Sequence, residues 1–281
     1  MTDAAWPNGA RCAVAVAVDF DAESVYTGRA PSDLRVSDPS TPWGKLSQGR
    51  FAGRFGAAQV RRILGERNVP ATWFVCGVDA EKWPEEIKAV VADGFELASH
   101  SYTHTAPALL TRDEERSEMQ RAATALAKFG VPVVGYRAPA LEPSDNTLNL
   151  LEEFGFRYVS NLQDDIYPYV HDSNDIVELP TAWLTNDTVH FWFDADSWVK
   201  RICSTAEARA VWEEEFLAVR EYGGLYVLTV HPMVIGRPSR LKMFGEFLDF
   251  LISHDDVWFA TMGEIAEHVR ESQPSLHAHT R

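Results

Sequence analysis

Two histidines and an aspartate stand where they could bind one metal ion. His100 and His104 are four residues apart, a spacing that places both imidazoles on one face of a helical turn, and Asp21 follows an apolar run elsewhere in the chain. Two histidines and one carboxylate leave open positions for water and substrate, as in catalytic zinc sites and non-haem iron oxygenases. The set predicts a catalytic metal site.

A second carboxylate, Asp19, is separated from Asp21 by a single residue. Successive side chains of a strand alternate between its faces, so both carboxylates should face one side and Phe20 the other. Two carboxylates this close would raise the pKa of one of them unless a cation neutralised the pair. A metal bound by one and a proton transferred by the other would resolve the repulsion. The alternative is a strand end whose carboxylates cap the next segment.

Other polar residues follow predicted strands as well. His231 could protonate a leaving nitrogen, since the unperturbed pKa of histidine is ~6.5, or it could be a core histidine bonded to backbone. Arg137 could hold a carboxylate in orientation, or lie at the surface beside a turn-forming proline. Asp164 and Asp165 follow another strand candidate. His190 and the histidines after it, His231 excepted, are expected at the surface, in loops or in the tail, without a role.

The elements that would position these residues alternate between short apolar runs and stretches of helical period. The predicted strands are Cys12–Phe20, Ala71–Cys76, Phe95–Ser99, Val131–Arg137, Arg157–Asn161, Ile176–Leu179, Tyr226–Val230 and Trp258–Ala260. The predicted helices are Ala57–Arg67, Pro84–Ala92, Thr111–Phe129, Asp145–Phe154, Thr205–Tyr222, Leu241–Ser253 and Met262–Arg270. The alternation predicts an α/β fold, a single distorted (β/α) barrel of seven or eight strands, with reactive groups at the carboxyl ends of the strands.

Two long segments interrupt this alternation. Val25–Phe55 is polar and rich in Gly, Pro, Ser and Arg, and Pro180–Arg201 is aromatic. Long loops in a compact domain are often lids or subunit contacts. The tryptophans within them are candidates for pocket walls, core packing or a subunit interface: Trp43, Trp183 and Trp198.

The length and composition of the chain suggest one domain without an internal linker. It has 281 residues, 46% of them hydrophobic, which is enough to bury a full core. We expect the domain to run from about Gly9 to about Glu271, and residues 272–281 to form a flexible C-terminal tail.

Charge and cysteine content exclude several classes of partner. The formal net charge of -15 would repel a phosphate backbone, so no nucleic acid is expected. No segment reaches the roughly 18 apolar residues that span a bilayer, and Met1–Cys12 lacks the pattern of a signal peptide, so no membrane partner is expected. Three scattered cysteines without a C-x-x-C spacing argue against a disulfide framework and fit a cytoplasmic location.

These motifs, in this order, resemble the polysaccharide deacetylase superfamily from Val14 to about Glu267. In that family an aspartate pair ends the first strand, H-[ST]-x-x-H supplies two metal ligands, R-x-P-x-G holds an arginine beside the base, and a late histidine is the acid. The resemblance implies a general base, an arginine that orients it, a general acid and three metal ligands. Asp19 is the implied base, Arg137 orients it and His231 is the implied acid. The implied metal ligands are Asp21, His100 and His104.

The chain departs from the usual family pattern in two places. The aspartates are separated in Val18-Asp19-Phe20-Asp21-Ala22, whereas the usual pair is adjacent, and the arginine motif ends in Ala140 without the final Gly. The separated form looks most like a branch that contains a Helicobacter-type peptidoglycan deacetylase, cyclic-imide hydrolases and allantoinase-like proteins. That branch implies a homo-oligomer without a secretion signal.

The resemblance implies hydrolysis of a non-peptide carbon–nitrogen bond by metal-activated water, with a small molecule or a saccharide as substrate. Zn²⁺ is the expected ion, and Fe²⁺, Co²⁺ and Ni²⁺ are the alternatives. A small cyclic imide or ureide fits a chain without an export signal, and the alternative is N-deacetylation of sugars or peptidoglycan. Two further alternatives are a non-haem iron oxygenase, which usually has a β-sandwich barrel, and a non-catalytic binding protein, which would lack the base that Asp19 supplies.

Overall fold

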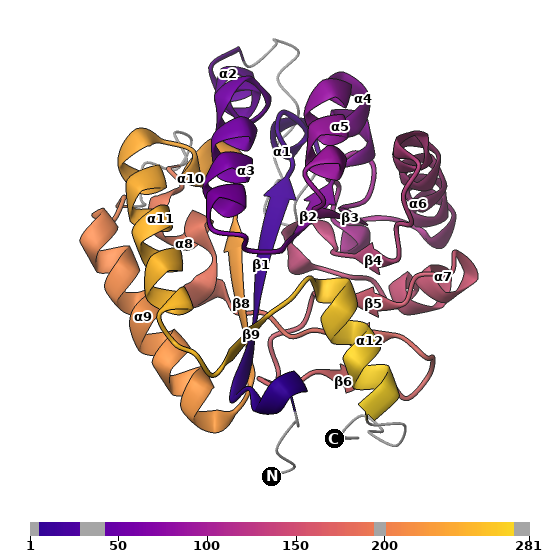
Figure 1. Cartoon of the computed structure of the whole chain (residues 1–281). Helices are drawn as coiled ribbons and strands as arrows, with labels where there is room; N and C mark the ends of the chain where they lie inside the picture. Colours follow the sequence, from indigo (N-terminus) through magenta and orange to yellow (C-terminus); the bar gives the residue numbers. More distant parts are fainter. Residues whose placement is uncertain (1–5, 29–42, 194–200, 273–281) are drawn as a thin grey trace.

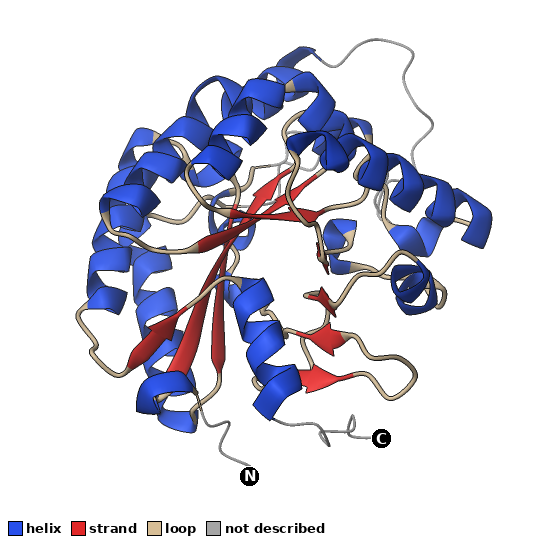
Figure 2. Ribbon diagram, turned by 45° about the vertical axis from the view of Figure 1, so that its right-hand side comes forward, coloured by secondary structure: helices blue, strands red, loops and turns tan. Residues whose placement is uncertain are grey.

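The computed structural model is a curled, mainly parallel sheet with helices packed around its outer face (Figures 1 and 2). It describes residues 6–28, 43–193 and 201–272. The strands are β1 (Cys12–Phe20), β2 (Ala71–Val75), β3 (Glu96–Ser99), β4 (Gly135–Tyr136), β5 (Tyr158–Val159), β6 (Tyr169–Val170), β7 (Val177–Glu178), β8 (Leu225–Val230) and β9 (Val257–Phe259). The helices are α1 (Ser24–Thr27), α2 (Trp43–Phe51), α3 (Ala57–Glu66), α4 (Gly77–Lys82), α5 (Pro84–Ala92), α6 (Arg112–Leu126), α7 (Thr147–Glu153), α8 (Asp187–Phe191), α9 (Thr205–Tyr222), α10 (Pro232–Ile235), α11 (Pro238–Ile252) and α12 (Met262–Ser272).

β1 is the strand around which the sheet is organised. It pairs in parallel with β2 and β9 and with β8. The sheet order β6-β7-β5-β4-β3-β2-β1-β8 curls it into a half-barrel, and the β6–β7 pair is antiparallel. A single parallel bridge, between Asn186 and Thr229, brings a later segment against β8. The predicted α/β barrel of irregular form is confirmed.

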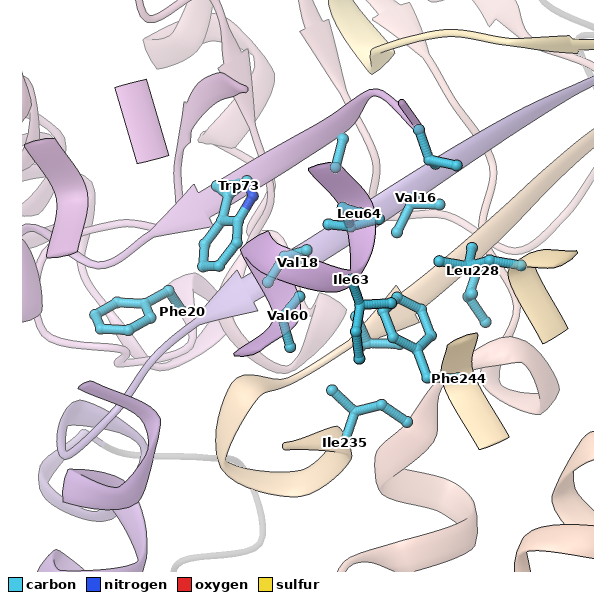
Figure 3. Packing of buried hydrophobic residues seen from close by; sticks show 14 of the residues in the cluster. Val16, Val18, Phe20, Val60, Ile63, Leu64, Trp73, Leu228, Ile235 and Phe244 are labelled. Atoms are coloured by element: carbon cyan, nitrogen blue, oxygen red, sulfur yellow. The ribbon is translucent and has the colours of Figure 1, made fainter. Parts of the chain in front are cut away.

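The two faces of β1 carry different side chains. The outward face packs under the helices in the main core, where Trp73 of β2, Ile63 of α3 and Phe244 of α11 are also buried (Figure 3). The residues of this face are Val14, Val16, Val18 and Phe20. The inward face carries Ala13, Ala15 and Ala17, whose small side chains leave room inside the half-barrel. Because side chains alternate along a strand, Asp19 continues this inward row.

Most predicted elements lie within two or three residues of their predicted positions. The exceptions are short. The predicted strand Val131–Arg137 is reduced to β4, since Pro132 lacks an N–H to donate to a neighbouring strand. The short elements β6, α4 and α10 were not predicted, because a few residues carry too little periodicity to show a pattern.

The predicted start and stop signals of the helix after β3 act as expected. Thr111 accepts a bond from the backbone N–H of Glu114, and the Glu114 side chain accepts from the backbone of Thr111, which completes a capping box. After a turn of 3-10 helix, the chain leaves the helix at Gly130 with φ of 73°, a left-handed conformation that suits glycine.

The segment Val25–Phe55 is not the irregular loop that its composition predicts. Its later part forms α2, which continues through a π-helical turn, Ala52–Gly56, into α3. Gly49 of α2 approaches the chain just after β1 so closely that a Cβ would lie 2.4 Å from the carbonyl oxygen of Ala22. The segment is therefore packed against the start of the site. Residues 29–42 lie outside the described part.

The remaining expectations concern the aromatic segment, the tail and the cysteines. The segment Pro180–Arg201 contains a 3-10 turn, Trp183–Thr185, and α8, and its residues 194–200, with Trp198, lie outside the described part. α12 includes Ser272, and the rest of the predicted tail also lies outside it. The cysteines are free. Among the described helices, none combines the length and apolarity that crossing a bilayer requires.

We expect Phe244→Ala to destabilise the protein by about 3–5 kcal/mol, because it removes a fully buried ring and leaves a cavity in the main core. Urea denaturation followed by circular dichroism measures the change. The matched control on the same helix is Lys242→Ala, whose side chain is 80% exposed and should change stability by less than ~0.5 kcal/mol. Equal effects of the two variants would contradict this assignment of the core.

Candidate metal centre and active site

Asp21, His100 and His104 converge where the carboxyl ends of β1 and β3 meet. One potential ligand atom from each residue lies within 4.8 Å of the others. His104 Nε2 is 3.3 Å from Asp21 Oδ2, and the imidazole centroids of His100 and His104 are 5.0 Å apart. The three residues predicted as metal ligands thus form a group with the composition and spacing of a metal site.

The two histidines meet by a route that the sequence did not predict. Residues 100–106, directly after β3, form no helical turn. Ser101 and His104 instead adopt left-handed backbone conformations, with φ of 62° and 61°. Non-glycine residues in this region are strained, and such strain concentrates at functional sites. The tight loop turns His104 back toward His100.

His100 is arranged to offer Nε2 to an ion. Its Nδ1 lies 2.8 Å from the backbone oxygen of Arg137, which fixes the tautomer with the proton on Nδ1. Burial lowers the pKa of His100 to about 4, despite the opposing effect of nearby carboxylates. The imidazole is therefore neutral at pH 7, the form that binds a metal.

Asp21 completes a set that fits a divalent cation. It is buried, and no described group donates a hydrogen bond to its Oδ1. Burial alone would raise its pKa, but His231 and His104 outweigh that effect and lower the value to about 2. A buried, ionised carboxylate with an unpaired oxygen beside two imidazoles is a suitable donor set for such an ion.

Asp19 is held by a buried arginine. Arg137 has no exposed surface, and its Nη1 donates to Asp19 Oδ1 at 2.8 Å and to the Thr229 hydroxyl at 3.2 Å. Its other nitrogens donate to the backbone oxygen and hydroxyl of Ser160, and the ring of Phe74 lies 4.4 Å below the guanidinium. Arg137 therefore fixes the orientation of the Asp19 carboxylate and lies inside the barrel, where it does not line the pocket.

His231 approaches Asp19 from β8 and is held by a residue that sequence reasoning missed. Its Nε2 lies 3.8 Å from Asp19 Oδ2, while its Nδ1 lies 2.7 Å from Asp187 Oδ1. Asp187 Oδ2 also accepts the backbone N–H of His231 at 2.9 Å. Asp187 is fully buried at the start of α8. It is the first residue of a five-residue helix and does not directly follow a predicted strand, so its position at a strand end could not reveal it.

The carboxylates around His231 control its protonation. Burial lowers the pKa of His231, but the charges of Asp187, Asp21 and Asp19 outweigh burial and raise the pKa to about 9. Burial raises the pKa of Asp187, although the charge of His231 and its hydrogen bonds to Asp187 oppose that rise. His231 is thus protonated at neutral pH, with Nε2 turned toward the site.

The site opens into a pocket of about 270 Å³. Asp19, Asp21 and the three histidines of the site form its polar floor. Its other described lining is mainly apolar and comes from several loops: Val25, Ala138, Ala140, Leu141, Trp183, Asn186, Thr188 and Trp192. Ala140 and Leu141, at the end of the arginine motif that lacks its glycine, have φ of 58° and 57°. Tyr26 of α1 stacks on Trp192, so the two irregular segments meet at the pocket wall.

Several sequence candidates lie elsewhere. Asp165 accepts backbone N–H groups of its own loop and Asp164 accepts the Tyr169 hydroxyl, and neither lines the pocket. Trp43 is 64% exposed beneath the Arg50 guanidinium, whereas Trp183 does line the pocket.

The sequence predicted His190 at the surface, in a loop or in the tail, and that prediction is wrong. It is buried, its Nε2 lies 2.8 Å from the backbone oxygen of Leu184, and its ring packs edge-on against Trp212. Its role is to pack the segment that carries Asp187. The short helix α8 turns this histidine inward, which its place in an irregular aromatic segment did not reveal.

A buried glutamate ties the segment after Asp21 to two helices. Glu23 accepts bonds from Arg50 of α2 at 3.1 Å, from Lys82 of α4 at 2.6 Å and from the Trp83 indole at 2.8 Å. The segment that carries Asp21 is therefore held in place at Glu23, two residues further on, by two cations and an indole N–H.

Comparisons with known proteins agree with this site and fold. The family model for polysaccharide deacetylase matches residues 54–159. A peptidoglycan deacetylase of Helicobacter pylori is 28% identical over 93% of this chain and 97% of its own length. A crystal structure from Mycobacterium smegmatis, described as a polysaccharide deacetylase, is 38% identical with a TM-score of 0.90, covering 98% of this chain and 96% of its own. Puue allantoinase shares the fold, with a TM-score of 0.86 at 23% identity over 98% of this chain and 95% of its own.

We expect the protein to bind one divalent ion and Asp21→Asn to weaken that binding, because the substitution removes the charge that attracts the ion. The loss in affinity should exceed the ~10–100-fold typical of losing an outer-shell partner. Titration calorimetry of metal-free protein with zinc chloride at pH 7 measures it. Asp164→Asn, an exposed carboxylate outside the pocket, is the matched control. Unchanged zinc affinity in Asp21→Asn would place the metal elsewhere.

Proposed function

The chain belongs to the polysaccharide deacetylase superfamily, and we propose that it is a metal-dependent hydrolase that opens a small cyclic imide or ureide at a carbon–nitrogen bond. The observation that carries this proposal is the paired arrangement at the end of β1. A metal-ligand group and the carboxylate-held His231 line the same pocket as Asp19, and His231 Nε2 lies 3.8 Å from Asp19 Oδ2.

Asp21, His100 and His104 would hold the ion, with zinc as the proposed metal and Fe²⁺, Co²⁺ and Ni²⁺ as alternatives. When bound, such an ion polarises the substrate carbonyl and makes a water molecule more acidic. The neutral form of His100, fixed by its bond to the Arg137 backbone, and the unpaired oxygen of Asp21 support this assignment.

The two proton transfers fall to Asp19 and His231, whose facing side-chain atoms lie 3.8 Å apart. Asp19, oriented by Arg137, would accept a proton from water as the water oxygen bonds to the carbonyl carbon. The carbon–nitrogen bond then breaks, and protonated His231 would deliver its Nε2 proton to the departing nitrogen. The products of a cyclic imide are a carboxylic acid and an amide on one open chain, which balances the addition of water.

The size and chemistry of the pocket support a small substrate. A volume of about 270 Å³ is below the usual range of pockets for drug-sized ligands. Its walls beyond the catalytic residues are mostly alkyl or aromatic, including Leu141, Trp183 and Trp192. A planar ring with carbonyl groups matches such walls, whereas a sugar polymer requires a longer groove and more hydrogen-bonding groups.

N-deacetylation of N-acetylated sugars or peptidoglycan is the second candidate, favoured by the similarity to the Helicobacter pylori protein over nearly the whole chain. Both candidates use the same reaction class. The homo-oligomeric state and the cytoplasmic location stay predictions of the sequence. The parallel strand–helix architecture argues against an iron oxygenase, and the presence of Asp19 beside the ligand group argues against a non-catalytic binding protein.

We expect zinc-loaded protein to open succinimide and to release no acetate from an N-acetylglucosamine oligomer. Infrared or chromatographic detection of the ring-opened amide and an acetate assay on the oligomer measure the two activities. In Asp19→Asn, ring opening should fall by ~10²–10⁴, because the proton acceptor is lost. Asp164→Asn should keep wild-type activity. Acetate release from the oligomer alone would replace the imide proposal with the deacetylase.

The pH dependence of ring opening should report on His231. The acid must be protonated, so kcat/KM should fall as pH rises through the pKa of His231, which nearby carboxylates raise to about 9. Asp187→Asn removes one of those charges, so the alkaline limb should move to lower pH. Pre-steady-state or steady-state pH profiles of both proteins measure the shift. An alkaline limb that stays in place would show that a different group supplies the proton.

A further inference from the structure

One polar side chain of the pocket has no part in the proposed chemistry. Asn186 is the N-cap residue of α8, directly before Asp187, and lines the pocket. The residue as a whole is 5% exposed.

The orientation of the Asn186 amide follows from its donors. Its side-chain oxygen accepts the backbone N–H of Thr188 at 2.9 Å and the Thr188 hydroxyl at 2.6 Å. A backbone N–H can only donate, so the atom that it contacts must be the amide oxygen, Oδ1. The Nδ2 group therefore points away from α8. No described residue accepts a hydrogen bond from it.

Capping alone does not explain this residue. The start of α8 uses only Oδ1, which a serine or an aspartate would supply equally well. With no acceptor among the described residues, this amide nitrogen loses a hydrogen bond unless water or a ligand accepts from it. The donor is thus available to a molecule in the pocket, with water in that position before the substrate arrives.

The location of Asn186 assigns it to the leaving-nitrogen side of the substrate. It forms a parallel bridge to Thr229, two residues before His231. Its neighbour Asp187 bonds both the ring and the backbone of His231. Nδ2 therefore belongs to the residue that directly precedes Asp187, which holds His231, the proposed proton donor.

We propose that Asn186 Nδ2 donates a hydrogen bond to a second carbonyl oxygen, the one attached to the leaving nitrogen of a cyclic imide or ureide. This inference rests on the proposed function and makes its substrate class specific. In an imide the nitrogen joins two carbonyl carbons, and water attacks one while the other stays on the departing amide. In an N-acetylated sugar the same nitrogen carries a saturated carbon, which offers no acceptor.

The remaining pocket lining agrees with a carbonyl ligand. Sugar hydroxyl groups need acceptors for their protons as well as donors. Beyond the catalytic residues, the side chains of the described lining offer the Asn186 donor and the Thr188 hydroxyl, which already donates to Asn186. An imide ring, with carbonyl oxygens and carbon atoms outside its reacting nitrogen, is satisfied by that lining.

The test is Asn186→Ser, assayed on succinimide and on 4-nitroacetanilide, an amide that also needs a protonated leaving nitrogen but has a single carbonyl. Serine retains a cap for α8 and lacks the amide donor. We expect kcat/KM for succinimide to fall about 10- to 100-fold, at least ten times more than for the anilide. Asn186→Asp, which keeps one oxygen for Thr188, should also lower succinimide turnover.

Asp187→Asn is the matched comparison, because it disturbs His231. It should lower kcat/KM for both succinimide and the anilide, and it should move the alkaline limb of the pH profile. Asn186→Ser should leave that limb in place. Equal losses on both substrates together with a moved limb would overturn the inference and make Asn186 a positioning residue for His231. No loss on succinimide would overturn it too. A wild-type protein that opens no imide would refute the proposed substrate class itself, and with it this inference.

Discussion

The structure depends on keeping the carboxylates of Asp19, Asp21 and Asp187 buried together at the carboxyl end of β1. A buried charge is costly unless cations or hydrogen bonds compensate it. Each carboxylate is compensated differently: Asp19 by Arg137, Asp187 by His231, and Asp21 by His104 on one of its two oxygens. No group in the described part of the chain donates to the other oxygen of Asp21, which leaves that oxygen available to a ligand.

The surrounding fold follows from that requirement. The inward alanines of β1 leave room for the Arg137 side chain, which crosses the barrel interior over the ring of Phe74 and reaches Asp19. The outward valines and Phe20 bury the opposite face under the helices, which makes the strand register difficult to change. A shift by one residue would bring the carboxylates into the hydrophobic core.

Backbone strain and buried polar bonds hold the loops around the site. Left-handed residues occur both in the histidine loop, at Ser101 and His104, and in the arginine loop, at Ala140 and Leu141. Strained loops persist when their surroundings determine their conformation. Here the Arg137 backbone oxygen binds His100, so the two loops support each other. The site is thus built largely before a substrate enters, which favours positioned proton transfer.

The sequence by itself determined the alternation of β1, the order of strands and helices, and the types of the reacting groups, because periodicity and strand-end position are local properties. It placed Asp19 and Asp21 on one face, and it identified four of the five other residues of the site, Asp187 being the exception. It did not determine the shape of the histidine loop, whose spacing resembles a helical turn, or the helices within the segment Val25–Phe55. Only the tertiary structure decided that Arg137 is buried against Asp19 and that Asp187 holds His231, because these facts depend on contacts between residues 118 and 44 positions apart in the chain. It also decided that Asn186 lines the pocket, since the bridge between Asn186 and Thr229 brings that segment against β8.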